Sequence, residues 1–253
     1  MIVKNSYGEV VLDLPKSDNA QIAISLSGGA DSAILLHHLV PILQANKHNW
    51  MIVTGGDTAR PWTGPAARKI AKMVLEHHGL NYTNIVHRFY GYDTTKLSEA
   101  DSQAMGIGKL VLEGEFDYLI SGTTALPDEQ TENLDAPGRP QERQENKILQ
   151  EHNIRILPNG EPCTLSNMNA GNETGKILTQ WRPWSKVNKK WIAEEYKTLI
   201  SNYSEYGDLL FNTTISCVSY AEYTQNFTKP CTYCWWCQEK KWAFGCYDAG
   251  YRD

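Results

Sequence analysis

Two glycines, an aspartate and a serine lie between a β-rich run and a helical pattern near the N-terminus. The β-rich run is Gln21–Ser27, and Ser27-Gly28-Gly29-Ala30-Asp31-Ser32 follows it. Glycines lack a Cβ, so they let backbone amides approach a ligand closely and adopt φ values that other residues avoid. The next helix would point its unpaired N–H groups and its positive dipole end at the same place. The pattern therefore predicts an anion site, to which serine hydroxyl groups contribute.

Asp31 is informative because a carboxylate repels an anion unless a cation lies between them. We therefore expect Asp31 to position Mg²⁺ on bound phosphates. A plainer interpretation is that Gly28-Gly29 forms a tight turn and Asp31 only caps the helix. The order of strand, glycine pair, aspartate, serine and helix favours phosphate binding. The predicted ligand-binding residues are Ser25, Ser27, Gly28, Gly29, Asp31 and Ser32.

Four of the six cysteines are close together near the C-terminus, in the pattern Cys217-x13-Cys231-x2-Cys234-x2-Cys237. In a reducing compartment such clustering favours metal ligation over disulfides. Gaps of two residues let neighbouring thiolates bind the same ion, and zinc is the default metal for four thiolates. A closed zinc site of this kind is structural, and an iron–sulfur cluster or unmetallated core cysteines are the alternatives. Cys163 and Cys246 stand apart, in no recognisable activating context.

The glycine segment resembles the S-G-G-x-D-S signature of the PP-loop (N-type ATP pyrophosphatase) superfamily. Members cleave ATP between its α and β phosphates, adenylate a carbonyl or carboxylate oxygen, and release pyrophosphate. Together with the cysteine cluster and the residues Gln-Glu-Lys-Lys-x-Ala-Phe244 after it, the chain resembles the 7-cyano-7-deazaguanine synthases. That family uses ATP and ammonia to convert 7-carboxy-7-deazaguanine into a nitrile. The resemblance implies ATP, Mg²⁺ and Zn²⁺ as cofactors, with ammonia and a carboxylated purine-like acceptor as substrates.

The resemblance also implies roles for single residues. Lys189 follows Arg182-Pro183 at the motif position of a lysine that stabilises charge on the departing pyrophosphate, although it could equally be an ordinary lysine on a helix surface. Asp31 and Lys189 are thus the predicted catalytic residues, and Arg182 is a weaker candidate. The stretch from Ser121 to Asp128 departs from the family's S-G-Y-P-D-C segment, which leaves the acceptor open. A PP-loop RNA-thiolating enzyme and a non-catalytic nucleotide-binding zinc module are the alternative functions.

The elements that position these residues alternate along the chain. Strand patterns separated by helical ones predict an α/β fold, a parallel sheet with helices on both faces. The resemblance implies the adenine nucleotide alpha hydrolase-like form of this fold, followed by a small zinc-binding C-terminal subdomain. We expect an ATP-binding domain over residues 1–205 and a zinc-binding region over 206–253. The expected strands and helices are an N-terminal hairpin over Met1–Leu14, strands at Gln21–Ser27, Trp50–Thr54, Asn84–Tyr90 and Tyr118–Ser121, and helices at Asp31–Val40 (ended by Pro41), Pro65–His78, Lys96–Gly114 and around Trp191–Leu199.

The long segment Thr123–Thr179 is rich in Pro, Gly, Asn and Gln and lacks periodicity, which favours a functional lid or substrate loop. The histidine pairs His37-His38 and His77-His78 fall on predicted helices, where packing or exposure explains them better than catalysis.

Composition restricts the remaining classes of function. A hydrophobic content of 41% excludes a disordered chain, and no apolar run is long enough to span a bilayer. The start of the sequence lacks a secretory pattern, so we expect a cytoplasmic protein. The net charge of −5 argues against a broad nucleic-acid-binding surface, although it does not exclude a local basic pocket. Small molecules are the expected partners, and a homodimer is compatible with this interpretation.

Overall fold

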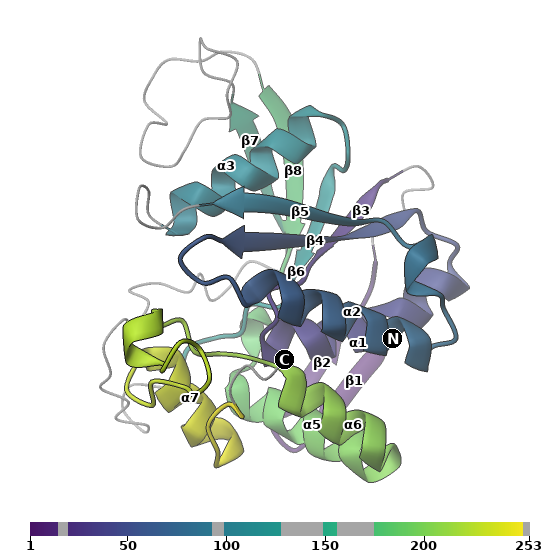
Figure 1. Ribbon diagram of the computed structural model, residues 1–253. Coiled ribbons are helices and arrows are strands. Elements are labelled where there is room, and N and C mark those ends of the chain that lie inside the picture. Colours follow the sequence, from purple (N-terminus) through teal and green to yellow (C-terminus); the bar gives the residue numbers. More distant parts are fainter. Residues whose placement is uncertain (15–19, 93–98, 128–148, 156–174, 250–253) are drawn as a thin grey trace.

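The computed structural model describes residues 1–14, 20–92, 99–127, 149–155 and 175–249. Figure 1 shows a sheet with helices on both sides and a group of C-terminal helices beside it. The strands are β1 (Ile2–Asn5), β2 (Gly8–Val11), β3 (Ile22–Ser25), β4 (Trp50–Asp57), β5 (His87–Tyr92), β6 (Tyr118–Ser121), β7 (Leu149–Arg155) and β8 (Gly175–Trp181). The helices are α1 (Ala30–Ala45), α2 (Thr63–His77), α3 (Glu99–Leu112), α5 (Lys189–Asn202), α6 (Ser204–Thr213) and α7 (Trp235–Phe244).

The main sheet has six strands in the order β5-β4-β3-β6-β8-β7. Five of them are parallel, and the edge strand β7 pairs antiparallel with β8. Strand β3 lies at the centre, where Ile22 is level with Trp50 of β4 and with Tyr118 of β6. The chain adds β4 and β5 on one side of β3 and then returns to add β6 on the other. The order of the strands therefore reverses between β3 and β6, and such a switch point is where open α/β sheets bind ligands.

Alternating residues of the central strands face two separate hydrophobic cores. Ile22 and Ile24 of β3 pack with residues of α1, α2 and α5 in the larger core. Ala23, between them, faces the opposite side, where Leu110 and Val111 of α3 cover the sheet. This two-sided burial explains why the strands are continuous apolar runs, and it confirms the α/β fold expected from the sequence.

The N-terminal hairpin and the helices after β8 form a layer beyond α1. The β1–β2 hairpin packs on α5: the indole N–H of Trp191 donates to the carbonyl oxygen of Gly8 at 3.1 Å, and the amide of Asn5 donates to the carbonyl oxygen of Trp191 at 3.1 Å. Helix α6 follows α5 directly and packs on α2. Tyr196 of α5 is fully buried, and its hydroxyl donates to the carbonyl oxygen of Ala30 at 3.1 Å. Helix α5 thus fixes the first turn of α1.

Two expectations about single elements were wrong. Helix α1 does not end at Pro41 but continues through it to Ala45. Pro41 cannot donate a hydrogen bond to the carbonyl of His37, yet Leu39 and Leu43 are completely buried on either side and hold the helix together. The segment 123–179 also contains regular structure, since it includes β7 and most of β8. Residues 128–148 and 156–174, which the predicted lid or substrate loop includes, lie outside the described part of the chain.

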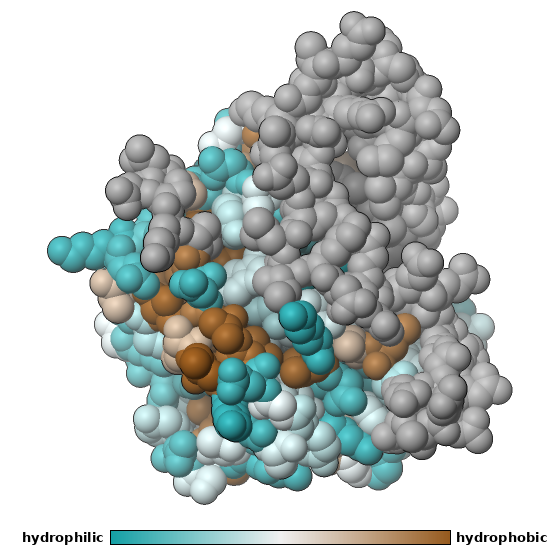
Figure 2. All heavy atoms as spheres, turned by 180° about the vertical axis from the view of Figure 1, so that it is seen from behind, coloured by the Kyte–Doolittle hydropathy of each residue, from teal (hydrophilic) through white to brown (hydrophobic). Residues whose placement is uncertain are grey.

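The described surface mixes polar and apolar residues. Figure 2 shows the molecule from behind, where hydrophobic residues gather in a band with hydrophilic residues on both sides. Within the described residues, no helix is both long enough and apolar enough to cross a membrane.

Candidate functional site

A cavity of about 380 Å³ opens at the carboxyl ends of the central strands. It lies at the switch point of the sheet, between the loop after β3 and the segment after β6. Its charged lining residues are three cations and one carboxylate: Arg60, Arg182, Lys189 and Asp31. Cations thus outnumber carboxylates among the lining residues, and the cavity has the size of a small-molecule site.

The glycine loop after β3 forms one wall of this cavity. Gly28 has φ +83°, a left-handed conformation that a side chain disfavours, and a Cβ on it would lie 3.3 Å from the Cβ of Ala66 in α2. Gly29 is the N-cap of α1. The hydroxyl of Ser32 accepts a hydrogen bond from the N–H of Ser27 at 3.2 Å and donates to the carbonyl oxygen of Gly29 at 3.1 Å. The loop therefore bends back over the first turn of α1, where helical N–H groups are unpaired.

Every predicted residue of the phosphate loop except Gly28 lines the cavity. The carbonyl of Gly28 instead accepts a hydrogen bond from the N–H of Ile215 at 2.9 Å, which anchors the loop to the segment after α6. Gly122, at the end of β6, packs against the other side: a Cβ there would lie 2.9 Å from the backbone carbonyl of Asp31. The structure brings these residues together, and their ligand remains a prediction.

The structure also brings the two predicted catalytic residues into contact. The ammonium of Lys189, at the start of α5, lies 2.5 Å from Oδ2 of Asp31 and 3.7 Å from Oε2 of Glu239 in α7. Lys189 is 4% exposed, so it is not an ordinary surface lysine. The second carboxylate oxygen of Asp31, Oδ1, is buried and has no hydrogen-bond partner in the described part of the chain. That oxygen keeps its lone pairs for a donor or a cation.

Two arginines contribute to the same cavity. The guanidinium of Arg182, which follows β8, donates to the side chain of Gln180 at 2.9 Å, and its buried Nε has no partner among the described residues. Burial lowers the pKa of Arg182 from its usual value, because low-dielectric surroundings disfavour the charged guanidinium. Arg60 follows β4 and is held by Asp57, whose Oδ2 lies 2.7 Å from the arginine Nε. Arg60 was not among the predicted site residues, although a position after the carboxyl end of a strand expected to be parallel is a signal for such a residue.

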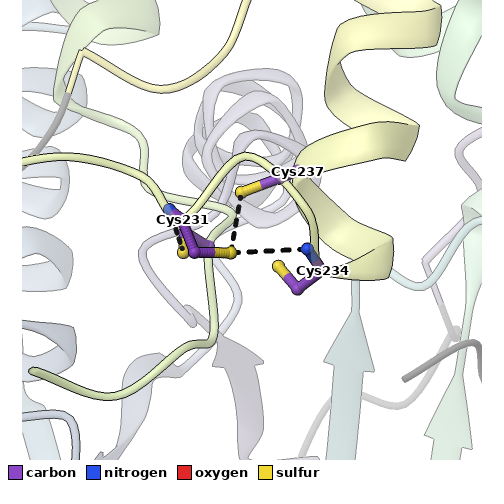
Figure 3. A group of neighbouring side chains, drawn as sticks. Cys231, Cys234 and Cys237 are labelled. Carbon is purple, nitrogen blue, oxygen red and sulfur yellow. Dashed lines mark hydrogen bonds between the residues drawn. The ribbon is translucent and has the colours of Figure 1, made fainter. Parts of the chain in front are cut away.

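The cysteine cluster lies at the start of α7. Cys217, Cys231, Cys234 and Cys237 are all buried, and their sulfur atoms lie within 4.8 Å of one another. Figure 3 shows the side chains of Cys231, Cys234 and Cys237 grouped beside the first turn of the helix. The sulfur atoms of Cys231 and Cys237 are 3.8 Å apart. Hydrogen bonds with Cys217 and Cys237 lower the pKa of the Cys234 thiol, while hydrogen bonds with Cys217 and Cys234 raise the pKa of Cys237, as expected of neighbouring thiols that share a proton.

These separations distinguish between the metal centres that four cysteines can hold. Bonds of about 2.3 Å to one tetrahedral ion place thiolates about 3.8 Å apart. A four-iron cluster puts each thiolate on a different iron atom, which separates the sulfurs by about 6 Å. The cysteine cluster therefore fits a single ion. Cys246 is half-buried and outside the cluster, and Cys163 lies outside the described residues.

Buried charges connect the cysteine cluster to the cavity. Asp248 accepts the N–H of Cys217 at 2.8 Å, and its other oxygen lies 2.5 Å from the ammonium of Lys240 in α7. The same helix carries Glu239, which is completely buried and lies near Lys189. A metal ion that fixes the start of α7 would therefore also fix one side of the cavity.

No protein-family model and no curated protein matches the chain. Among solved structures, the chain is similar to the U34-tRNA thiolase NcsA from Methanococcus maripaludis with its 4Fe-4S cluster. The match has a TM-score of 0.30 and 15% sequence identity, and it covers 43% of this chain and 40% of that chain. A likeness of this size supports no conclusion about the activity or the cofactor of this chain.

Proposed function

We propose that the chain is an ATP-dependent adenylating enzyme that holds the pyrophosphate of ATP on the loop from Ser27 to Ser32. The observation that carries this proposal is the position of that loop. It joins a central strand to a helix N-terminus at the switch point of the sheet, and three cationic side chains line the same cavity. Helix N–H groups, hydroxyl groups and cations together are the donors that a polyphosphate requires.

The residues around Asp31 suggest how the phosphates are held. The unpartnered Oδ1 of Asp31 is the group that would bind Mg²⁺ on the phosphates. Lys189 balances the charge of the other oxygen and remains within reach of the leaving pyrophosphate. Mg²⁺, when bound, supplies positive charge that stabilises the leaving group. Most of the catalysis is then electrostatic.

The proposed reaction begins with attack on the α phosphorus of ATP by an acceptor carboxylate oxygen. The bond from that phosphorus to the bridging oxygen breaks, and pyrophosphate leaves with the electron pair. Ammonia then attacks the acyl carbon, AMP leaves, and an amide remains after loss of a proton. A second ATP adenylates the amide oxygen, with release of pyrophosphate and of one amide proton, and elimination of AMP and the second amide proton yields the nitrile.

The acceptor is proposed to be 7-carboxy-7-deazaguanine or a similar carboxylated purine-like base, as the sequence resemblance implies. Trp62, Tyr90 and Trp236 line the cavity, and aromatic side chains are groups on which a base can stack. The single-ion geometry of the cysteine cluster supports structural zinc, and a zinc centre argues for the ligase over an iron-dependent RNA thiolase.

Incubation of the purified protein with ATP, MgCl₂, ammonium and 7-carboxy-7-deazaguanine tests this proposal. We expect AMP and the nitrile, both detected by mass spectrometry, with two AMP formed per nitrile. The matched control is Asp31→Asn, which should bind ATP weakly and form neither product. Formation of AMP only with tRNA and a sulfur donor would establish the thiolase instead. ATP binding without AMP for any acceptor would establish a non-catalytic module.

A further inference from the structure

Four of the seven histidines of the chain form one cluster away from the cavity and the cysteines. His37 and His38 lie in α1, His77 is the last residue of α2, and His78 is its C-cap. The rings of His37 and His78 have centroids 4.9 Å apart, and those of His37 and His77 are 5.6 Å apart. Two sequence-distant pairs thus meet where α1 passes the end of α2.

Three of these imidazoles converge through their ring nitrogens. His37, His77 and His78 each offer one nitrogen, and the three nitrogens lie within 4.8 Å of one another. Nδ1 of His37 and Nε2 of His78 are 3.1 Å apart. Bonds of about 2.0 Å to one tetrahedral ion place two nitrogens about 3.3 Å apart, so this pair already has the separation of two ligands on one metal.

The surroundings favour a cation over protonated histidines. Burial, followed by the charges of neighbouring histidines, lowers the pKa of His37 to about 2, and burial also lowers the pKa of His77 and of His78. Nδ1 of His37 and Nε2 of His78 are close enough for a hydrogen bond, so at least one of these two nitrogens carries no proton and has a lone pair that can bind a metal. The C-terminal end of α2, where the dipole is negative, lies at the same place.

Helix α6 supports the orientation of the rings and leaves room beside them. The ring of Tyr206 stacks on His77 with centroids 3.7 Å apart and an angle of 1°, and its hydroxyl lies 3.2 Å from Nδ1 of His37. A hollow of about 590 Å³ adjoins His77 and is lined by two carboxylates, those of Glu76 and Glu205. A bound ion could thus complete its coordination with water from this side.

We propose that His37, His77 and His78 form a second metal site, separate from the cysteine cluster, that takes a divalent transition ion such as zinc or nickel. Three imidazoles are a ligand set that these ions prefer. The ion would join α1 to the end of α2. The site depends on neither ATP binding nor adenylation, so it stands or falls independently of the proposed function.

Nickel binding to the full chain tests the proposal. The metal in the cysteine cluster is first quantified by inductively coupled plasma mass spectrometry, and the protein is then titrated with NiCl₂ by isothermal calorimetry. We expect one equivalent of nickel to bind while the original metal stays in place, and the melting temperature to rise with nickel concentration. The variants are His77→Gln and His78→Gln, and His48→Gln is the control because His48 lies outside the cluster.

Each ligand variant should lower the affinity for nickel by on the order of 10²-fold or more. Loss of a residue that only hydrogen-bonds to a metal ligand already lowers metal affinity by about 10–100-fold, and loss of a ligand itself should cost at least as much. The His48→Gln variant should bind as the wild type does. Should the His78→Gln protein fail to fold, the His77→Gln variant still gives the answer, because His77 is half-buried at the end of its helix. Equal nickel binding by the wild type and the His77→Gln variant would overturn the proposal, and so would the absence of any bound nickel.

Discussion

Replacement of Lys189 by glutamine separates a structural role of this lysine from its role on ATP. The change leaves the carboxylates of Asp31 and Glu239 at the buried edge of the cavity without the ammonium that lies 2.5 Å from one and 3.7 Å from the other. Removal of one partner from a buried ion pair costs about 3–5 kcal/mol. The side chain of Asp31 is 17% exposed, so we expect about 3 kcal/mol, the lower end of that range.

Two measurements follow from this magnitude. In a chain of this size, a loss of about 3 kcal/mol lowers the melting temperature by about 6–12 °C. Loss of one group that stabilises the leaving pyrophosphate lowers kcat by about 10²–10³-fold. The matched control is Lys190→Gln, which removes the same charge from the next residue, outside the lining of the cavity.

The double variant Asp31→Asn/Lys189→Gln distinguishes the two effects. It removes the nearer of the two carboxylates together with the ammonium, while Glu239 stays without its cation, so part of the lost stability should return. Formation of AMP should not return, because both groups that act on the phosphates are gone. A Lys189→Gln protein that has a lower melting temperature but near-normal kcat would refute the catalytic role and leave only the structural one.

The remaining predictions concern the loop, the cysteine cluster and a buried histidine. Gly28→Ala should weaken ATP binding, measured by calorimetry, because a Cβ there would lie 3.3 Å from a side chain of α2. The control is Gly79→Ala, at a glycine that has a similar φ of +73° but open space around it. It should lower the free energy of unfolding by about 1–2 kcal/mol and leave ATP binding unchanged. Cys234→Ser should lower both the metal content and the affinity for ATP, since α7 begins at this cluster and contributes to the cavity wall. Unchanged ATP affinity in a metal-free protein would contradict this connection between the metal and the cavity. Burial, and then the charge of Arg68, lowers the pKa of His87 to about 4. The unfolded chain takes up this proton near pH 6.5, so the native protein should lose stability as the pH falls from about 6.5 towards 4, and the melting temperature of a His87→Asn variant should fall less steeply over that range.

Local patterns were sufficient to predict strand β3, which is buried on both sides, and helix α2, which is buried on one. Both lie within a few residues of their predicted segments, because an apolar run and an amphipathic stripe are patterns of residues that are close together in the sequence. Strands β7 and β8 were missed. The sequence of β7 is mostly polar, that of β8 mixes polar residues with Leu178 and Trp181, and both take a strand conformation through pairing with each other and of β8 with β6. The division of the chain at residue 205 stays a prediction.

The candidate site was predictable where one segment contains it and unpredictable where the fold assembles it. The loop from Ser27 to Ser32 is one short stretch of sequence, and the cysteines follow one another at short spacings, so both could be found in the sequence alone. The contact between Asp31 and Lys189 joins residues 158 positions apart, and no spacing rule indicates it. The gathering of His37 with His77 and His78 depends in the same way on how α1 and α2 pack.

A crystal structure of the protein with Mg²⁺ and an ATP analogue that cannot be cleaved between the α and β phosphates tests the central claim most directly. We predict that the β and γ phosphates lie on the loop from Ser27 to Ser32, with the metal ion beside Oδ1 of Asp31 and Lys189 within hydrogen-bond distance of the phosphates. Phosphates bound elsewhere on the molecule, or failure to bind any adenine nucleotide, would contradict the account.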